Sequence, residues 1–216
     1  MIEVVLLSLR VAAVAVVASL PLAVGVAWLL ARARFRGRVV VDAIVHLPLV
    51  LPPVVTGYLL LTLFSPRGPW GGLGLGFTTA GAALASAAVA FPLMVRPIRL
   101  AFEATDPGLL DAAKSLGANP WRAFWTIALP LARPGILAGA LLAFGRSLGE
   151  FGATITFVGN IAGETRTLPL ALYNALQIPG GEGEATTLAL VSTALAFGAL
   201  IAGELLARTG RWTYSR

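Results

Sequence analysis

The chain lacks cysteine altogether and carries little charge for its length. It has 216 residues, no cysteine and a single histidine, His46, so disulfides, thiolate metal sites and a histidine cluster are all excluded. Only 12% of the residues are charged and 57% are hydrophobic, whereas a soluble domain carries about 25% charged residues. In water such a chain would expose large apolar surfaces. The composition therefore predicts an integral membrane protein.

Five apolar stretches are long enough to cross a bilayer as helices, which takes about 20 residues at about 1.5 Å each. They cover residues 6–30, 39–64, 78–95, 135–158 and 186–207. We expect an all-α fold with about five transmembrane helices in one domain, residues 1–216. A cleaved signal peptide has positive charge before a short apolar core. Here most of the charge follows the first stretch, which indicates an uncleaved anchor.

Basic residues are concentrated in alternate loops between these stretches. Twelve lie on one predicted side, namely Arg32, Arg34, Arg36, Arg38, Arg96, Arg99, Lys114, Arg122, Arg133, Arg208, Arg211 and Arg216. The other side holds three, Arg10, Arg67 and Arg166. Because basic loops stay in the cytosol, we expect the N-terminus outside and the C-terminus inside. Their position in loops, rather than on one face of a soluble fold, argues against nucleic-acid binding.

The cytosolic segment between the third and fourth stretches, about residues 96–134, is too polar to span and has helix start and stop signals. Asp106 and Pro107 form an N-cap and first-turn pair, and Asn119 and Pro120 repeat it. Gly117 between them is typical of a left-handed C-terminal cap. The segment is therefore expected to form two short helices joined by a sharp corner.

Three large aromatics, Trp121, Phe124 and Trp125, follow at helical spacing on the second of these helices. A solvated connector does not explain them, because an apolar helix facing the cytosol is usually covered. From these residues alone, membrane helices of the same chain and a partner protein are equally good covers. Pro130 and Pro134 are expected to mark the return to the membrane.

Residues 111–130, DAAKSLGANPWRAFWTIALP, resemble the EAA loop of ABC-importer permeases. The matching positions are Asp111, Ala112, Ala113, Gly117, Ile127, Leu129 and Pro130, with Lys114 inside the same helix. Asp111 stands where the family usually has Glu, which keeps the charge and shortens its reach. In that family the loop is the coupling helix that docks on a separate ATPase subunit. The resemblance therefore favours the partner protein as the cover.

Two further stretches, residues 145–160 and 163–173, resemble molybdate permeases in particular, while sulfate and thiosulfate permeases share the LGEFG core. The resemblance implies a permease subunit in the cytoplasmic membrane for a tetrahedral oxyanion, with molybdate first and sulfate, thiosulfate or tungstate as alternatives. Its implied partners are a second copy of the chain, two ATPase subunits and an extracytoplasmic molybdate-binding protein. ATP and Mg²⁺ would bind the ATPase, and this chain would bind no cofactor.

Arg146 and Glu150 lie four residues apart in the fourth stretch, where ionisable groups are costly. They predict a pair on one helix face. The pair either locks the helix to its neighbours or lines the path of an oxyanion, and the structural role is favoured. Ser147 and Thr154 either face an aqueous path or bond their own helix carbonyls.

Prolines interrupt the second stretch, so Pro52 is a further candidate for the translocation path, with simple packing as an equal alternative. Glycines spaced four apart, at 135 and 139 and at 145 and 149, predict close helix packing. The outside region, residues 159–185, is either a docking face for the binding protein or an ordinary surface loop.

The sequence contains no motif that indicates an enzyme. It has no G-x-x-x-x-G-K-[ST] loop, and the glycine run at residues 71–76 has no following lysine. Glu150 alone does not supply the paired acids that an intramembrane enzyme needs. A passive channel is the remaining alternative, but a channel does not require a cytosolic docking loop.

Overall fold

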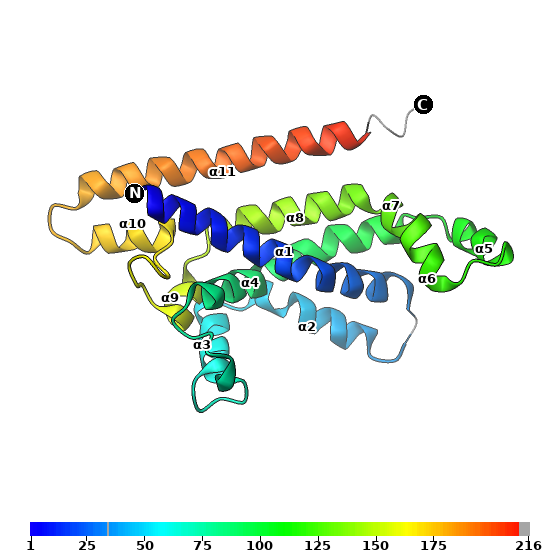
Figure 1. The fold of residues 1–216 in the computed structure, drawn as a ribbon, viewed down its shortest axis with the longest axis horizontal. Coiled ribbons are helices and arrows are strands. Elements are labelled where there is room, and N and C mark those ends of the chain that lie inside the picture. The colour runs from blue at the N-terminus through cyan, green and yellow to red at the C-terminus, as the bar shows by residue number, and fades with distance from the viewer. Residues whose placement is uncertain (34, 212–216) are drawn as a thin grey trace.

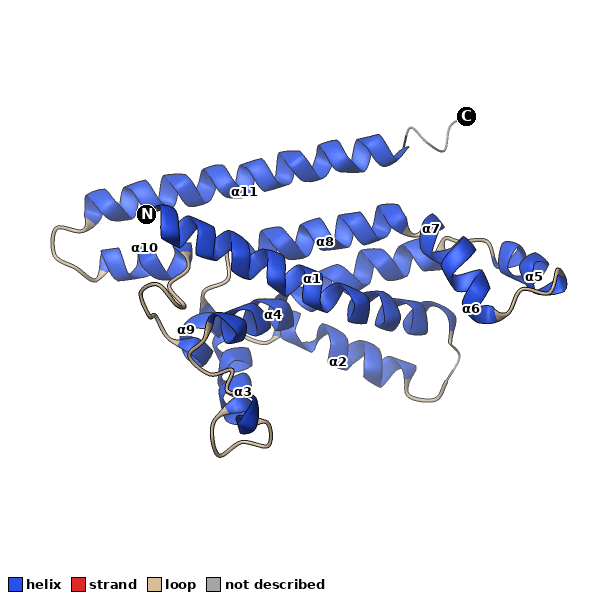
Figure 2. Cartoon of the chain, viewed as in Figure 1, coloured by secondary structure: helices blue, strands red, loops and turns tan. Residues whose placement is uncertain are grey.

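The computed structural model describes residues 1–33 and 35–211, and within them every regular element is helical (Figures 1 and 2). Arg34 and Arg216, which entered the orientation argument, lie outside the described residues. Three helices are long and apolar enough to span a membrane: α1 (Ile2–Arg32), α4 (Thr79–Glu103) and α11 (Glu182–Arg211). Two bent helix pairs raise the number of possible spans to five.

The predicted second span is two helices, α2 (Arg38–Val50) and α3 (Pro53–Phe64), that meet at 113°. Pro52 and Pro53 have no N–H to continue the α2 ladder, and Pro53 instead occupies the first turn of α3. The expected bent rod over residues 39–64 is therefore a sharp break. Figure 1 shows α3 turned away from the direction of α2.

The apolar stretch over residues 135–158, expected as one helix, is broken into two. Helix α8 (Arg133–Leu148) ends before Gly149, and a separate helix, α9 (Gly152–Val158), follows after three residues. The short helices of the cytosolic segment join α8 at a bend of 66°.

The outside region contains more structure than the expected loop. Helix α10 (Leu168–Leu176) packs against α11 through Leu168, Ala171 and Leu188. The backbone N–H of Leu168 donates to the Ser8 hydroxyl at 2.7 Å and so ties α10 to α1. The glycine run forms a single 3₁₀ turn, η1 (Gly71–Leu73), in a surface loop.

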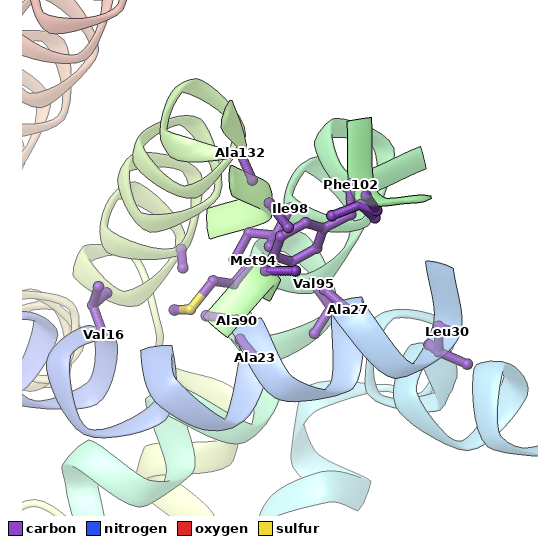
Figure 3. Close-up of a cluster of buried hydrophobic side chains, with 14 residues drawn as sticks. Val16, Ala23, Ala27, Leu30, Ala90, Met94, Val95, Ile98, Phe102 and Ala132 are labelled. Carbon is purple, nitrogen blue, oxygen red and sulfur yellow. The ribbon is translucent and has the colours of Figure 1, made fainter. Parts of the chain in front are cut away.

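The main core lies between α1, α4 and α8, and Figure 3 shows its small and branched side chains interleaving. Glycines at the start of α8 allow the closest contact. A Cβ on Gly139 would lie 2.6 Å from the carbonyl oxygen of Met94, and one on Gly135 would meet Ala101. Close packing is confirmed for these two glycines, whereas Gly145 has open space beside it.

Candidate functional site: a cytosolic coupling segment and a buried ion pair

The segment between the membrane helices is shorter than predicted, because α4 continues to Glu103 and carries Arg96 and Arg99 with it. Helix α5 (Pro107–Ser115) begins where the Asp106 carboxylate accepts a hydrogen bond from the Gly108 N–H at 2.9 Å. This side-chain cap satisfies a donor that the first helical turn leaves free. The predicted start of the first short helix is confirmed.

The corner after α5 is built as its sequence predicts. Gly117 has φ of +85°, a left-handed conformation that residues with a Cβ rarely adopt. Its N–H donates to the carbonyl of Lys114 and the N–H of Ala118 donates to the carbonyl of Ala113, each at 2.9 Å. This pair of bonds defines a Schellman cap. Beyond it, the Asn119 side chain accepts from the Arg122 N–H at 2.7 Å and starts the next helix.

The second helix runs without a gap through α6 (Pro120–Ala123), a π-helical turn η2 (Phe124–Ala128) and α7 (Leu129–Leu131). Pro130 lies inside α7 and Pro134 occupies the first turn of α8, so the two prolines flank the 66° bend. Their expected place at the return to the membrane stays a prediction. A π turn widens the helix by one residue and is frequent at functional sites.

Of the three aromatics of this helix, one packs against the bundle and two are exposed. Phe124 packs edge-on against Trp28 of α1 with ring centroids 5.0 Å apart. Trp121 and Trp125 remain 69% and 50% exposed. Helices of the same chain therefore cover only part of this aromatic surface, and Trp121 and Trp125 remain uncovered.

The residues that resemble the EAA motif divide in the same way. Asp111, Ala112, Lys114 and Gly117 are exposed, with the Lys114 ammonium 2.9 Å from the Asp111 carboxylate. The later positions, Ile127 and Leu129, pack against the main core, as does Ala113. One face of the segment is thus anchored in the bundle and the other is exposed.

Arg32 at the end of α1 is a positioning residue that the sequence argument counted only as a loop charge. Its Nη2 donates to the carbonyl oxygens of Phe102 at 2.9 Å and Thr105 at 2.7 Å, at the end of α4. Its guanidinium also lies 5.7 Å from the Trp28 ring centroid. These contacts fix the base of the coupling segment to α1. No local motif signals them, since the partners are about 70 residues away.

The predicted Arg146–Glu150 pair is present, with Arg146 Nη1 2.7 Å from Glu150 Oε2. The two residues do not share one helix, because α8 ends between them. Glu150 is 2% exposed, and its Oε1 accepts a hydrogen bond from the Ala153 N–H at 2.8 Å in the first turn of α9. The carboxylate therefore joins the ends of α8 and α9.

The other path candidates lie around this pair. Ser147 and Thr154 are 5% and 1% exposed, and neither hydroxyl has a hydrogen-bond partner among the described residues. Pro52 is exposed at the break between α2 and α3. A role in the path stays a prediction for all of them, and the buried ones would need a helix movement to meet cargo.

The two helix breaks lie against each other. A Cβ on Gly152, at the start of α9, would lie 2.9 Å from the Cβ of Pro53, at the start of α3. One on Gly57 would lie 2.6 Å from the carbonyl oxygen of Ala153. Helices α3 and α9 therefore cross in backbone contact.

Glu164 links the loop after α9 to the start of α4. Its Oε1 accepts from the Thr79 backbone N–H and hydroxyl, each at 3.0 Å. The backbone hydrogen bond, followed by the hydroxyl, lowers the pKa of Glu164 from its ordinary value of 4.5. This loop is thereby fastened to the membrane bundle.

Comparison with known proteins adds three findings. Residues 10–210 match the family described as binding-protein-dependent transport system inner membrane component. The molybdenum transport system permease protein ModB of Escherichia coli K12 is 54% identical, over 97% of this chain and 94% of that protein. A MetNI methionine ABC transporter structure in inward-facing conformations superposes with a TM-score of 0.78 at 19% identity, over 97% of this chain and 95% of that one.

Proposed function

Since the chain belongs to the family of binding-protein-dependent transport system inner membrane components, we propose that it is the membrane subunit of an ATP-driven importer of molybdate. The main support for this proposal is the capped coupling segment with its exposed face. The chain that carries it is 54% identical to a molybdenum transport permease. The segment offers a rigid docking face, and the chain has no phosphate-binding loop of its own. ATP with Mg²⁺ would bind two partner ATPase subunits, and this chain would bind no cofactor.

The proposed topology has five spans, with the N-terminus outside and the C-terminus in the cytosol. It treats α2 with α3 and the α7–α8 bend as interrupted crossings. The basic loops support this orientation, since they fall on the side of the coupling segment. Five spans of one chain rarely enclose a pore, so we place the path between two copies related by a two-fold axis.

In the proposed cycle, the two ATPase subunits draw the coupling segments together when they bind ATP. Arg32 passes the movement to α1, and the α7–α8 bend passes it to α8. A loaded binding protein docks on the outside face, which includes α10 and the Glu164 loop. Arg146, Ser147, Glu150, Thr154 and Pro52 remain the candidates for residues along the path.

Sulfate, thiosulfate and tungstate are the alternative cargoes, because all are tetrahedral dianions of similar size. A passive anion channel is the alternative mechanism. The exposed coupling segment weighs against the channel, because a channel has no ATPase to dock.

The test is uptake of labelled molybdate into vesicles that hold this chain, its ATPase and its binding protein. We expect uptake that needs ATP and survives excess sulfate. Uptake that excess sulfate abolishes would indicate that the cargo is sulfate instead of molybdate. Uptake that proceeds without ATP would refute the ATP-driven importer.

A further inference from the structure

A cluster of ionisable side chains that the proposed cycle does not use lies between α2 and α4. Five such residues line a cavity of about 460 Å³, together with Leu49, Val50 and Leu100. They are Asp42 and His46 of α2, and Arg96, Arg99 and Glu103 of α4. Their arrangement shows which of the charges are already neutralised.

Arg99 is the centre of an ion-pair network. Its Nη1 lies 2.8 Å from Asp42 Oδ1, and its Nε lies 2.8 Å from Glu103 Oε1. Arg38 adds a second cation 3.3 Å from Glu103, and the His46 ring nitrogen Nδ1 lies 2.8 Å from the Asp42 carbonyl oxygen. The charges of Arg38 and Arg99 thus cancel those of the two carboxylates, Asp42 and Glu103.

Arg96 lines the same cavity without joining the network. It is exposed and makes no ion pair with any residue that the structure describes. With the network neutral, Arg96 leaves the cavity with one net positive charge. A dianion entering this space would therefore meet a single unpaired cation.

The charges extend well into the membrane helices. His46 is eight residues from the first residue of α2, and Arg96 is seven from the last residue of α4. At 1.5 Å per residue these positions lie about 10–12 Å along the helices. Charged groups on a membrane-spanning part of a helix face water or protein rather than lipid. Exposed residues on the opposite side of α2, such as Val40 and Ile44, are apolar and suit lipid or protein contact.

The inner end of the cavity reaches the break in the second span. Leu49 and Val50 line it, and Pro52 follows at the 113° turn. The cavity therefore runs from the cytosolic ends of α2 and α4 to a point where the helix backbone is interrupted. Interrupted backbone at membrane depth is tolerated where it lines a wet cavity.

We infer that the cavity between α2 and α4 is the cytosolic exit vestibule for the transported dianion, with Arg96 as the cation that draws it from the helix break. The inference rests on the proposed function for the identity of the cargo, but the aqueous character of the cavity stands on the charges alone. The neutral network keeps the attraction weak enough for release, as conduction requires.

The absence of cysteine allows a direct test, because a substituted cysteine is the only thiol in the chain. Arg96→Cys is compared with Arg36→Cys. Arg36 is an exposed arginine of the loop before α2 that lies outside the cavity and makes no ion pair among the described residues. Both thiols are treated with positively or negatively charged methanethiosulfonate reagents in inverted vesicles, whose outer face is the cytosolic one, and labelling is measured. The treated complex is then reconstituted into proteoliposomes, in which ATP-dependent molybdate uptake is measured.

We expect the Arg96→Cys thiol to react from the cytosolic side. The positive reagent should restore uptake, and the negative reagent should slow it about fivefold or more through repulsion of the dianion. Uptake by Arg36→Cys should be indifferent to the sign of the reagent. A structural role for Arg96 would not produce this dependence on sign.

A thiol at position 96 that does not react, or equal uptake after both reagents, would overturn the vestibule. Failure of the proposed function looks different. In that case the unsubstituted complex takes up no molybdate on addition of ATP, while the thiol at position 96 still reacts from the cytosolic side. The aqueous cavity would then stand without its assigned cargo.

Discussion

Replacing Gly117 by valine tests whether the corner of the coupling segment carries the mechanical link to the ATPase. A Cβ at Gly117 meets no atom within 4 Å, so the substitution causes no clash and acts through the backbone alone. At φ of +85° a β-branched residue is strongly disfavoured. Left-handed backbone costs an ordinary residue roughly 1–2 kcal/mol, and we take that range as the minimum for valine.

A cost of about 1–2 kcal/mol lowers the population of the native corner relative to an extended alternative by a factor of about 5–30. Losing the corner also releases the two Schellman bonds between α5 and residues 117–118. The docking face of α5 would then be displaced from the second helix. We expect ATP hydrolysis to persist while molybdate uptake per ATP falls about fivefold or more.

The assay is the ratio of molybdate uptake to ATP hydrolysis in proteoliposomes that hold the whole complex. Gly117→Asn is the matched control, because asparagine tolerates the left-handed region and should keep most of the coupling. Equal membrane levels of both variants would separate coupling from insertion. A normal ratio for Gly117→Val would refute the link between corner geometry and coupling.

Three further outcomes follow from the buried contacts. Glu150→Ala should lower the free energy of unfolding, measured in thermal melts, by about 2–3 kcal/mol. This is less than for a fully buried pair, because the Arg146 side chain is 30% exposed. An unchanged melt would contradict this prediction. Gly57→Ala should lower the free energy of unfolding by about 1–3 kcal/mol, because its Cβ would clash with the α9 backbone. Gly25→Ala is the control and should not do so, because Gly25 has open space beside it. Equal melts for the two variants would show that α3 and α9 do not cross closely. The pKa of Glu164 is lowered in the folded protein, so its carboxylate stabilises the folded state fully above the ordinary pKa of 4.5. This stabilisation is lost as the pH falls through the folded pKa. Glu164→Gln should therefore reduce the loss of stability at acid pH. A pH profile identical to that of the unsubstituted protein would disprove that contribution.

The coupling segment was predictable because its signals are local. Asp106, Gly117 and Asn119 each act on a backbone group within five residues of themselves. A cap residue that makes such a short-range bond does so whatever surrounds it. The two helices, the corner between them and the prolines in their first turns were therefore predicted correctly.

The helix breaks were not predictable in the same way, because tertiary contacts decide them. Hydropathy is continuous from Gly135 to Val158, so the sequence indicated one span. The structure ends α8 at Leu148 because Glu150 turns to the α9 backbone while it pairs with Arg146. The close crossing of α9 with Gly57 then holds the short helix in place. The spacing of Arg146 and Glu150 predicted their pair, but the bond from Glu150 to the α9 backbone and the approach of Gly57 to α9 leave no mark in composition or periodicity.

The π turn at Phe124–Ala128 has a consequence for the angular setting of the docking face. In an α-helix each residue advances the side chains by about 100° around the axis. A π turn holds one residue more than the α-helix around it, so it fixes how the Trp121 side of the second helix is rotated about its axis relative to α7 and α8. The same residues wound entirely as an α-helix would swing that side by about 100°. The π turn between Gly117 and Pro134 thus sets the direction that the aromatics of the second helix face.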